Sequence, residues 1–102
     1  MEYSTQSDVG GQIFTLSGSL TFKDAAKLSE IQGHLRQGDQ DKPCVFDLSR
    51  VEFIDSSGLG MFLKLRDQVL DQGSEIILRN PQDKVMKVFK ACKYEALFTI
   101  EN

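Results

Sequence analysis

The chain has 102 residues, with 15 acidic and 12 basic side chains and a formal net charge of −3. This length predicts one domain, residues 1–102, that buries about two-thirds of its unfolded surface. The acidic balance argues against nucleic acid as a partner, because phosphate binding needs a basic patch. No apolar run approaches the ~20 residues of a membrane span, and no signal peptide is visible. We therefore expect a cytoplasmic protein without direct membrane insertion.

The first third predicts strands followed by a helix. Residues 1–10 are polar, which indicates a loose or weakly paired start. The composition of Gln12–Leu16 is typical of a strand. Gly18 indicates a turn or bulge, after which Ser19–Thr21 is expected to form a second short strand. The pair Thr21 and Asp24 has the spacing of a capping box that opens a helix.

The first helix is expected to bury one face and to end in a polar stretch. Gly38 and the polar residues 37–42 are expected to end this helix. The residues that recur on the apolar face are Ala25, Leu28, Ile31 and Leu35.

The central third predicts a buried strand and a very apolar helix. Pro43 starts the strand. The run Cys44–Leu48 is expected to be buried, and Cys44-Val45-Phe46 is apolar on both faces, as in a strand covered from both sides. The helix is predicted to span Leu59–Leu70, with Gly73 as the C′ residue just beyond its end. Its apolar stripe comprises Leu59, Phe62, Leu63 and Leu70, widened by Met61, Leu65 and Val69.

The last third predicts a strand, a third helix and a short final element. Glu75–Leu78 is the strand, and Asn80-Pro81 is expected to cap the helix and open its first turn. Residues 94–100 indicate a short helix or an edge strand. The buried face of the helix is expected to comprise Val85, Val88, Phe89 and Cys92. Cys44 and Cys92 both sit in apolar patterns, which favours reduced core thiols over a disulfide or metal pair.

One stretch organises the chain: Asp55-Ser56-Ser57-Gly58-Leu59-Gly60, between the central strand and helix. Ser and Asp are preferred N-caps, and the positive end of a helix favours an anion. Gly58 and Gly60 leave the backbone bare, so that another chain can approach closely. On these residues alone, an ordinary capped turn is the favoured interpretation.

Catalytic motifs are absent. The serines lack the Gly-x-Ser-x-Gly frame of a hydrolase, and the single histidine, His34, has no feature that brings it to Ser57. No Walker loop is present, and one histidine with two scattered cysteines disfavours a metal site. We therefore expect no enzyme and no cofactor.

The Asp55–Gly60 stretch resembles the signature of the STAS family, the anti-sigma factor antagonists. Three flanks support the resemblance: Leu16–Leu20 resembles an early Leu-x-Gly-x-Leu strand, Val45–Val51 the central strand, and Gly73–Leu78 a later strand. The resemblance implies an α/β fold, with a mixed sheet of four or five strands packed against about four helices.

The same resemblance implies a phosphorylated serine. The second hydroxyl of the family's Asp-Ser-Ser/Thr-Gly-Leu-Gly pattern is the modified one, which is Ser57 here; Ser56 is the runner-up. The family commonly has an acidic residue where this chain has Thr21, which leaves the details of kinase recognition open. The residues expected to contact a partner are Thr21, Asp55, Ser56, Gly58, Leu59, Gly60 and Met61, of which Met61 is the best candidate for partial exposure.

The implied partners are an anti-sigma factor that is also a serine kinase, which itself binds ATP and magnesium, and a metal-dependent serine phosphatase. The output is a bacterial sigma factor, and hence transcription, or another signalling pathway. A STAS subunit with a constitutive structural role in a transporter or signalling complex is the alternative.

Overall fold

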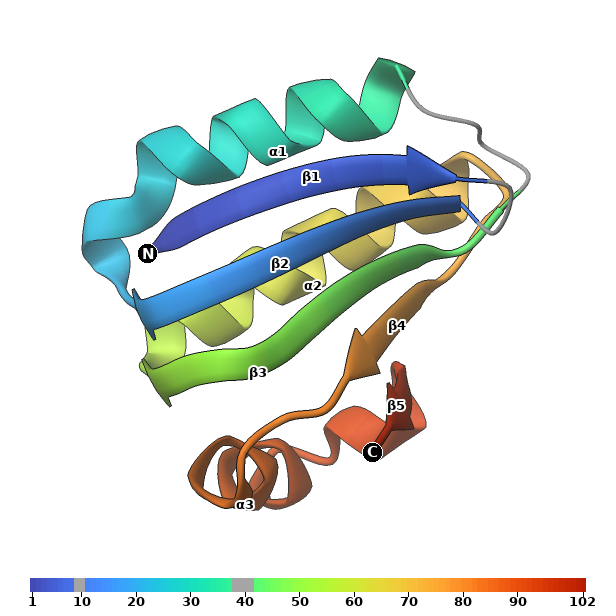
Figure 1. The fold of residues 1–102 in the computed structure, drawn as a ribbon. Coiled ribbons are helices and arrows are strands. Elements are labelled where there is room, and N and C mark those ends of the chain that lie inside the picture. Colours follow the sequence, from blue (N-terminus) through green and yellow to red (C-terminus); the bar gives the residue numbers. More distant parts are fainter. Residues whose placement is uncertain (9–10, 38–41) are drawn as a thin grey trace.

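In the computed structural model, which describes residues 1–8, 11–37 and 42–102, one sheet has the strand order β1-β2-β3-β4-β5 (Figure 1). β1 is antiparallel to β2, and the other neighbouring pairs are parallel. The strands are β1 (Glu2–Asp8), β2 (Gly11–Leu20), β3 (Cys44–Ile54), β4 (Ile76–Arg79) and β5 (Thr99–Glu101). The helices are α1 (Ala25–Gln37), α2 (Ser56–Asp71) and α3 (Asp83–Ala91), with short 3-10 helices η1 (Phe22–Asp24) and η2 (Tyr94–Ala96).

The expected mixed α/β sheet is confirmed. The described residues contain three α-helices instead of about four, because the short helix expected within residues 94–100 is a 3-10 helix, η2. Residues 94–100 supply both alternatives, a 3-10 helix and the edge strand β5. None of the described helices is both long enough and apolar enough to cross a membrane.

The expectation of a loose start is wrong for residues 2–8. These residues form β1, which pairs with β2 from Glu2 opposite Ser17 to Asp8 opposite Gly11. Backbone pairing does not require an apolar side-chain pattern, so a polar segment can complete the edge of a sheet. The aromatic ring of Tyr3 contacts that of Phe14, which also holds the strand.

β2 is one strand, so the expected separate strand at Ser19–Thr21 is wrong. The alternative of a bulge is correct, because the register with β3 shifts between Thr15 and Ser17 and again between Gly18 and Ser19. Gly18 has a φ of 84°, a conformation that favours glycine.

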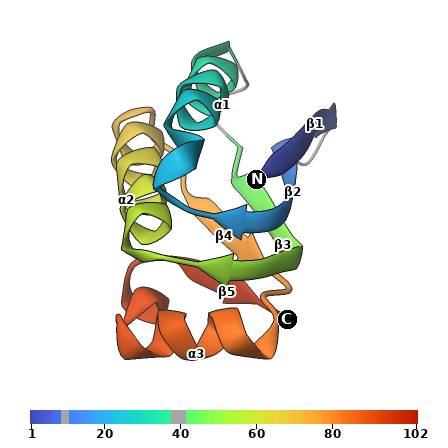
Figure 2. The ribbon, with the colours of Figure 1, turned by 90° about the vertical axis from the view of Figure 1, so that its left-hand side faces the viewer.

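α1 and α2 lie along one face of the sheet, and α3 packs separately against β3 (Figures 1 and 2). On α1 the apolar face is confirmed for Leu28, Ile31 and Leu35, whereas Ala25 is exposed. The helix ends at Gln37, and the expected stop at Gly38 lies outside the described residues.

The phase of α2 differs from the prediction. Leu63 and Leu70 are exposed, whereas Met61 is buried. The reason is that Gly58 packs against β2, so positions that follow it at helical spacing face the core. The buried residues of α2 are Gly58, Met61, Phe62, Leu65 and Val69. Gly73, with a φ of 83°, follows the helix as predicted, and its N–H bonds to the Leu70 carbonyl.

The predicted start of α3 is also wrong, by two residues at the N-cap. The helix begins at Asp83 after Gln82, not after Asn80. Asn80 instead adopts a φ of 56° and donates its N–H to the carbonyl of Glu101, 2.7 Å away, so it still serves the sheet. Cys92 is exposed and not a core thiol, whereas Cys44 is buried; both are free. Val88 is half-buried.

Aromatic rings form a continuous line through the core. Starting at β1, successive centroid separations are 6.3, 5.0, 5.6, 6.3 and 5.2 Å. The rings in order are Tyr3, Phe14, Phe46, Phe62, Phe89 and Tyr94. This line joins β1 to η2 across the sheet and α2.

Candidate functional site

α2 starts immediately after β3, with Asp55 as the single residue between them. The Asp55 N–H donates to the carbonyl of Leu20, 3.1 Å away, which ties the junction to the end of β2. Its Oδ1 accepts the N–H of Gly58 at 2.9 Å, so the expected N-cap is present. The first turn of α2 is therefore anchored at both its backbone and its cap.

Ser56 and Ser57 are the first two residues of α2, and both are exposed. Within the described part of the chain, neither hydroxyl has a hydrogen-bond partner. Both Oγ atoms thus face solvent at the positive end of a helix, where an attached anion is favoured. Exposure alone does not separate Ser56 from Ser57.

The two glycines of the motif have different surroundings. Gly58 is buried, and a Cβ placed on it would lie 2.6 Å from the Leu20 carbonyl oxygen and 2.7 Å from Cγ1 of Ile54. The bare backbone of Gly58 therefore admits this chain's own strands, not a partner. Gly60 is half-buried, with nothing within 4 Å of a built Cβ, so the expected room for another chain exists there.

Of the two apolar residues expected at the partner surface, Leu59 is the more exposed and Met61 the more buried. Met61, expected to be partly exposed, is buried at 8% exposure, while Leu59 is half-buried. The carbonyl of Leu59 also accepts a hydrogen bond from the buried hydroxyl of Tyr94. Sequence reasoning missed this contact because Tyr94 lies 35 residues further along the chain.

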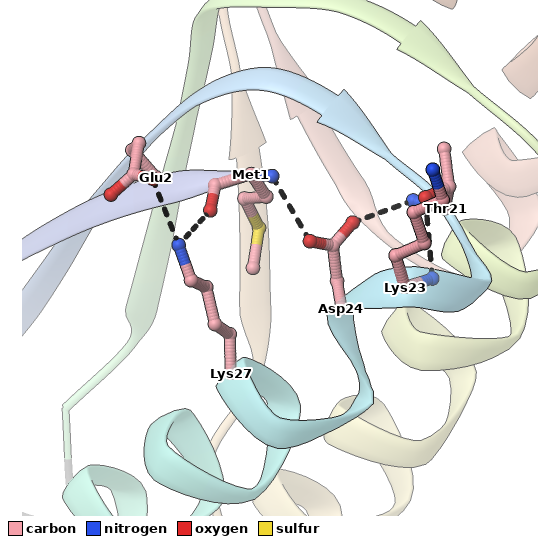
Figure 3. A network of polar contacts seen from close by, with 6 residues as sticks. All are labelled: Met1, Glu2, Thr21, Lys23, Asp24 and Lys27. Atoms are coloured by element: carbon pink, nitrogen blue, oxygen red, sulfur yellow. Dashed lines mark hydrogen bonds and ion pairs between the residues drawn. The ribbon is translucent and has the colours of Figure 1, made fainter.

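Thr21 follows Leu20 directly and so lies beside the Asp55 junction. It is half-buried and caps η1, with the expected capping box in place: its N–H donates to Asp24 Oδ2 at 2.7 Å (Figure 3). Asp24 Oδ1 also accepts a hydrogen bond from the Met1 ammonium at 3.0 Å. The Lys27 ammonium donates to the Met1 carbonyl and to the Glu2 carboxylate. This network fixes the segment that follows β2.

The charge of Asp24 is stabilised in place. Burial alone raises the pKa of this carboxyl, but the Thr21 N–H, the terminal ammonium and Lys27 outweigh burial and hold its pKa below the ordinary value. Thr21 is thus followed three residues later by a buried carboxylate.

His34 lies in the C-terminal half of α1 and contacts the rings of Tyr3 and Phe14. Among the described residues there is no group of three or more histidine, cysteine or acidic side chains suited to a metal.

Two large apolar side chains near the junction are exposed, which the sequence patterns did not predict. Phe22, in η1, is 71% exposed and Phe53, at the end of β3, is 54% exposed. The alternation of apolar and polar residues in the sequence does not indicate whether a residue near the end of a strand is exposed. Phe53 lies three residues before Ser56 in the chain, and Phe22 follows the Leu20 that bonds to Asp55 by two residues.

A family model described as "STAS domain" matches residues 1–102. A STAS-domain containing protein of Pseudomonas aeruginosa (strain UCBPP-PA14) is 39% identical over 56 residues, a match that spans 55% of each chain. The match thus covers about half the length of this relative.

Several solved structures share the fold, including two of SpoIIAA. The anti-sigma factor antagonist SpoIIAA in its unphosphorylated form has a TM-score of 0.80 and 21% identity, covering 99% of this chain and 89% of that one. The Bacillus cell fate determinant SpoIIAA in the phosphorylated form has a TM-score of 0.67 and 20% identity, covering 99% and 92%. The shared fold is that of a binding module and not of an enzyme family.

Proposed function

Because this chain belongs to the STAS domain family, we propose that it is a phosphorylation-controlled protein-binding module of the anti-sigma factor antagonist type. The unphosphorylated protein binds a serine kinase that is also an anti-sigma factor. Phosphorylation of one serine at the start of α2 makes the protein release this kinase. The observation that carries the proposal is the exposure of both serine hydroxyls at the start of α2. A kinase can reach these atoms without unfolding the domain.

The proposed modified residue is Ser57, with Ser56 as the runner-up. Ser57 occupies the second hydroxyl of the Asp55–Gly60 pattern. It lies in the first turn of α2, where the helix dipole favours a negative group, so the modified helix stays folded. The structural likeness to SpoIIAA, which is known in unphosphorylated and phosphorylated forms, supports a fold that tolerates the modification.

The switch acts through charge at the contact surface. A phosphate adds about −1.5 to −2 charges and three strong acceptor oxygens. The carboxylate of Asp55 already lies beside the serines, so the modification concentrates negative charge on one small area. A partner that packs closely there must then desolvate a dianion, and any acidic partner group is repelled.

The residues proposed to contact the partner divide into two groups. Ser56 is exposed, and four further residues are half-buried, so that all five can touch a docked protein directly; the four are Thr21, Asp55, Leu59 and Gly60. Gly58 and Met61 are buried and act by holding the first turn of α2 in place. A metal-dependent serine phosphatase completes the proposed cycle, with a sigma factor as the output.

Mass spectrometry of the protein recovered from its own cells, with site localisation and identification of co-purified proteins, tests this function. We expect phosphate on Ser57 and a co-purified serine kinase. A constitutive complex with a membrane protein and no phosphate would instead indicate a fixed structural subunit.

Binding of the co-purified kinase to four variants then tests the switch. Ser57→Asp should weaken binding about tenfold or more, the equivalent of 1.4 kcal/mol, while Ser57→Ala leaves it unchanged. Ser56→Asp and Ser56→Ala are the matched pair. Equal binding by Ser57→Asp and Ser57→Ala would remove Ser57 as the switch, and a loss confined to Ser56→Asp would move the role to Ser56.

A further inference from the structure

The basic side chains are unevenly distributed. Although the chain is acidic overall, residues 83–93 contain four lysines and one acid, Asp83. All four lysines are exposed, and within the described ranges none of them is in an ion pair. They are Lys84, Lys87, Lys90 and Lys93. The first three lie on α3 and Lys93 follows its end, so α3 presents a positive outer face on a negative protein.

An apolar groove runs beside this face. It lies between the end of β3 and α3, has a volume of about 110 Å³, and is bordered by the exposed ring of Phe53 and the half-buried Val88. Its lining residues are Glu52, Phe53, Ile54, Lys84, Val85 and Val88. One acid, Glu52, faces the groove from β3, and one lysine, Lys84, faces it from α3.

One residue that lines the groove lies close in the chain to the two serines. Ile54, which lines the groove, is joined to Ser56 by Asp55 alone. Figure 2 shows the first turn of α2, the end of β3 and α3 on the same part of the molecule. A segment seated in the groove would therefore lie on the same part of the molecule as the serine-bearing turn.

We propose that this groove, its lining residue Lys84 and the exposed Lys87 three residues further along α3 bind an acidic segment of the partner protein. One apolar side chain of that segment is inserted beside Phe53 and Val88. The proposal rests on the proposed function, and it names the chemistry of the partner at the same site. An apolar pocket next to unpaired cations matches a segment that carries both apolar and acidic side chains.

The exposed face favours a protein segment over a membrane. A helix that lies on a bilayer presents its apolar side chains outward, whereas α3 turns Val85 and Phe89 into the core. Its outer face carries lysines, and its apolar recess is a narrow groove.

An acidic occupant also gives the switch its direction. When Ser57 carries a phosphate, the first turn of α2 gains up to two negative charges, which repel the acidic segment. The lysines of α3 attract the segment, and the modified serine opposes it.

The test uses fluorescence anisotropy with a fluorescein-labelled synthetic peptide of glutamate and leucine, at low and high salt. A peptide of the same length with lysine in place of glutamate is the comparison. We expect the acidic peptide to bind the full chain and to weaken with salt, because exposed charge pairs are screened. The double variant Lys84→Glu/Lys87→Glu should bind about tenfold or more weakly, and the lysine peptide should not bind the original protein.

Two further variants separate the docking surface from general effects. Arg36→Glu/Lys64→Glu makes the same charge change on α1 and α2 and should bind like the original protein, since both residues are exposed elsewhere. Glu52→Gln removes the one acid of the groove and should strengthen binding severalfold, a gain that misfolding cannot produce.

Equal losses in the two double variants, no gain with Glu52→Gln, or binding to phosphatidylserine vesicles in place of the peptide would overturn the proposal. These outcomes are independent of the switch. Equal kinase binding by Ser57→Asp and Ser57→Ala, with peptide binding still lost in Lys84→Glu/Lys87→Glu, would overturn the proposed function and support the docking surface.

Discussion

The hydroxyl of Tyr94 donates a hydrogen bond to the carbonyl oxygen of Leu59, which links η2 to the first turn of α2. Tyr94 is buried and its ring also stacks on Phe89 at 5.2 Å. The segment after α3 therefore supports the helix turn that carries the two serines.

Tyr94→Phe removes this hydrogen bond and keeps the ring. We expect the free energy of unfolding to fall by about 0.5–1.5 kcal/mol, the usual net value of one such bond. Urea denaturation measures it. Tyr3→Phe is the matched control, because the Tyr3 hydroxyl bonds to the exposed Glu30 and its loss should cost less. Equal effects of the two variants would show that the Leu59 contact adds nothing.

Alkaline pH should destabilise the domain. Burial raises the pKa of the Cys44 thiol to about 12, and burial together with the charge of Cys92 raises the pKa of Tyr94 to about 12. Since both values lie above the ordinary 9.0 and 10.0, the protonated groups give stability that is fully present below about pH 9 and is lost as the pH rises toward 12.

Urea denaturation at a series of pH values checks this prediction, with Tyr94→Phe expected to show a shallower decline. A free energy of unfolding that stays constant from pH 9 to 12 would contradict the buried, protonated state of these groups.

Gly58→Ala and Gly60→Ala should have opposite effects. The Cβ at position 58 would meet Leu20 and Ile54 below 3.0 Å, so we expect a loss of about 1–3 kcal/mol. At position 60 nothing lies within 4 Å, and alanine in a helix should stabilise by about 0.5–1 kcal/mol. Thermal unfolding of both variants measures the difference. Similar midpoints would mean that α2 does not rest closely on β2.

Removing the cap of α2 should cost stability without disturbing the core. Asp55→Ala loses the acceptor for the Gly58 N–H, at an expected cost of about 1 kcal/mol. Asp55→Asn keeps an acceptor oxygen and should remain close to the original protein. If alanine and asparagine are equally stable in urea denaturation, the cap contributes little.

The sequence predicts features that depend on local chemistry. The Thr21–Asp24 capping box, the left-handed Gly73 and the junction at Asp55 each rest on residues a few positions apart, and all three are present. Such contacts form within a single turn, so spacing alone specifies them.

Features that depend on distant pairing were not predictable in this way. The strand at residues 2–8 forms because β2 supplies its hydrogen-bond partners. Met61 is buried and Leu63 is exposed because Gly58 sets the phase of α2 against Leu20. Asn80 serves β5 through Glu101 and does not cap α3. In each case the deciding residue lies outside the local pattern.

The line of aromatic rings has a practical consequence for spectroscopy. The chain has no tryptophan and two tyrosines, and these tyrosines stand at the two ends of that line. Tyr3→Phe would leave Tyr94 as the one tyrosine, hydrogen-bonded to Leu59 in the serine-bearing turn. Its emission would then follow events at that turn without any attached dye.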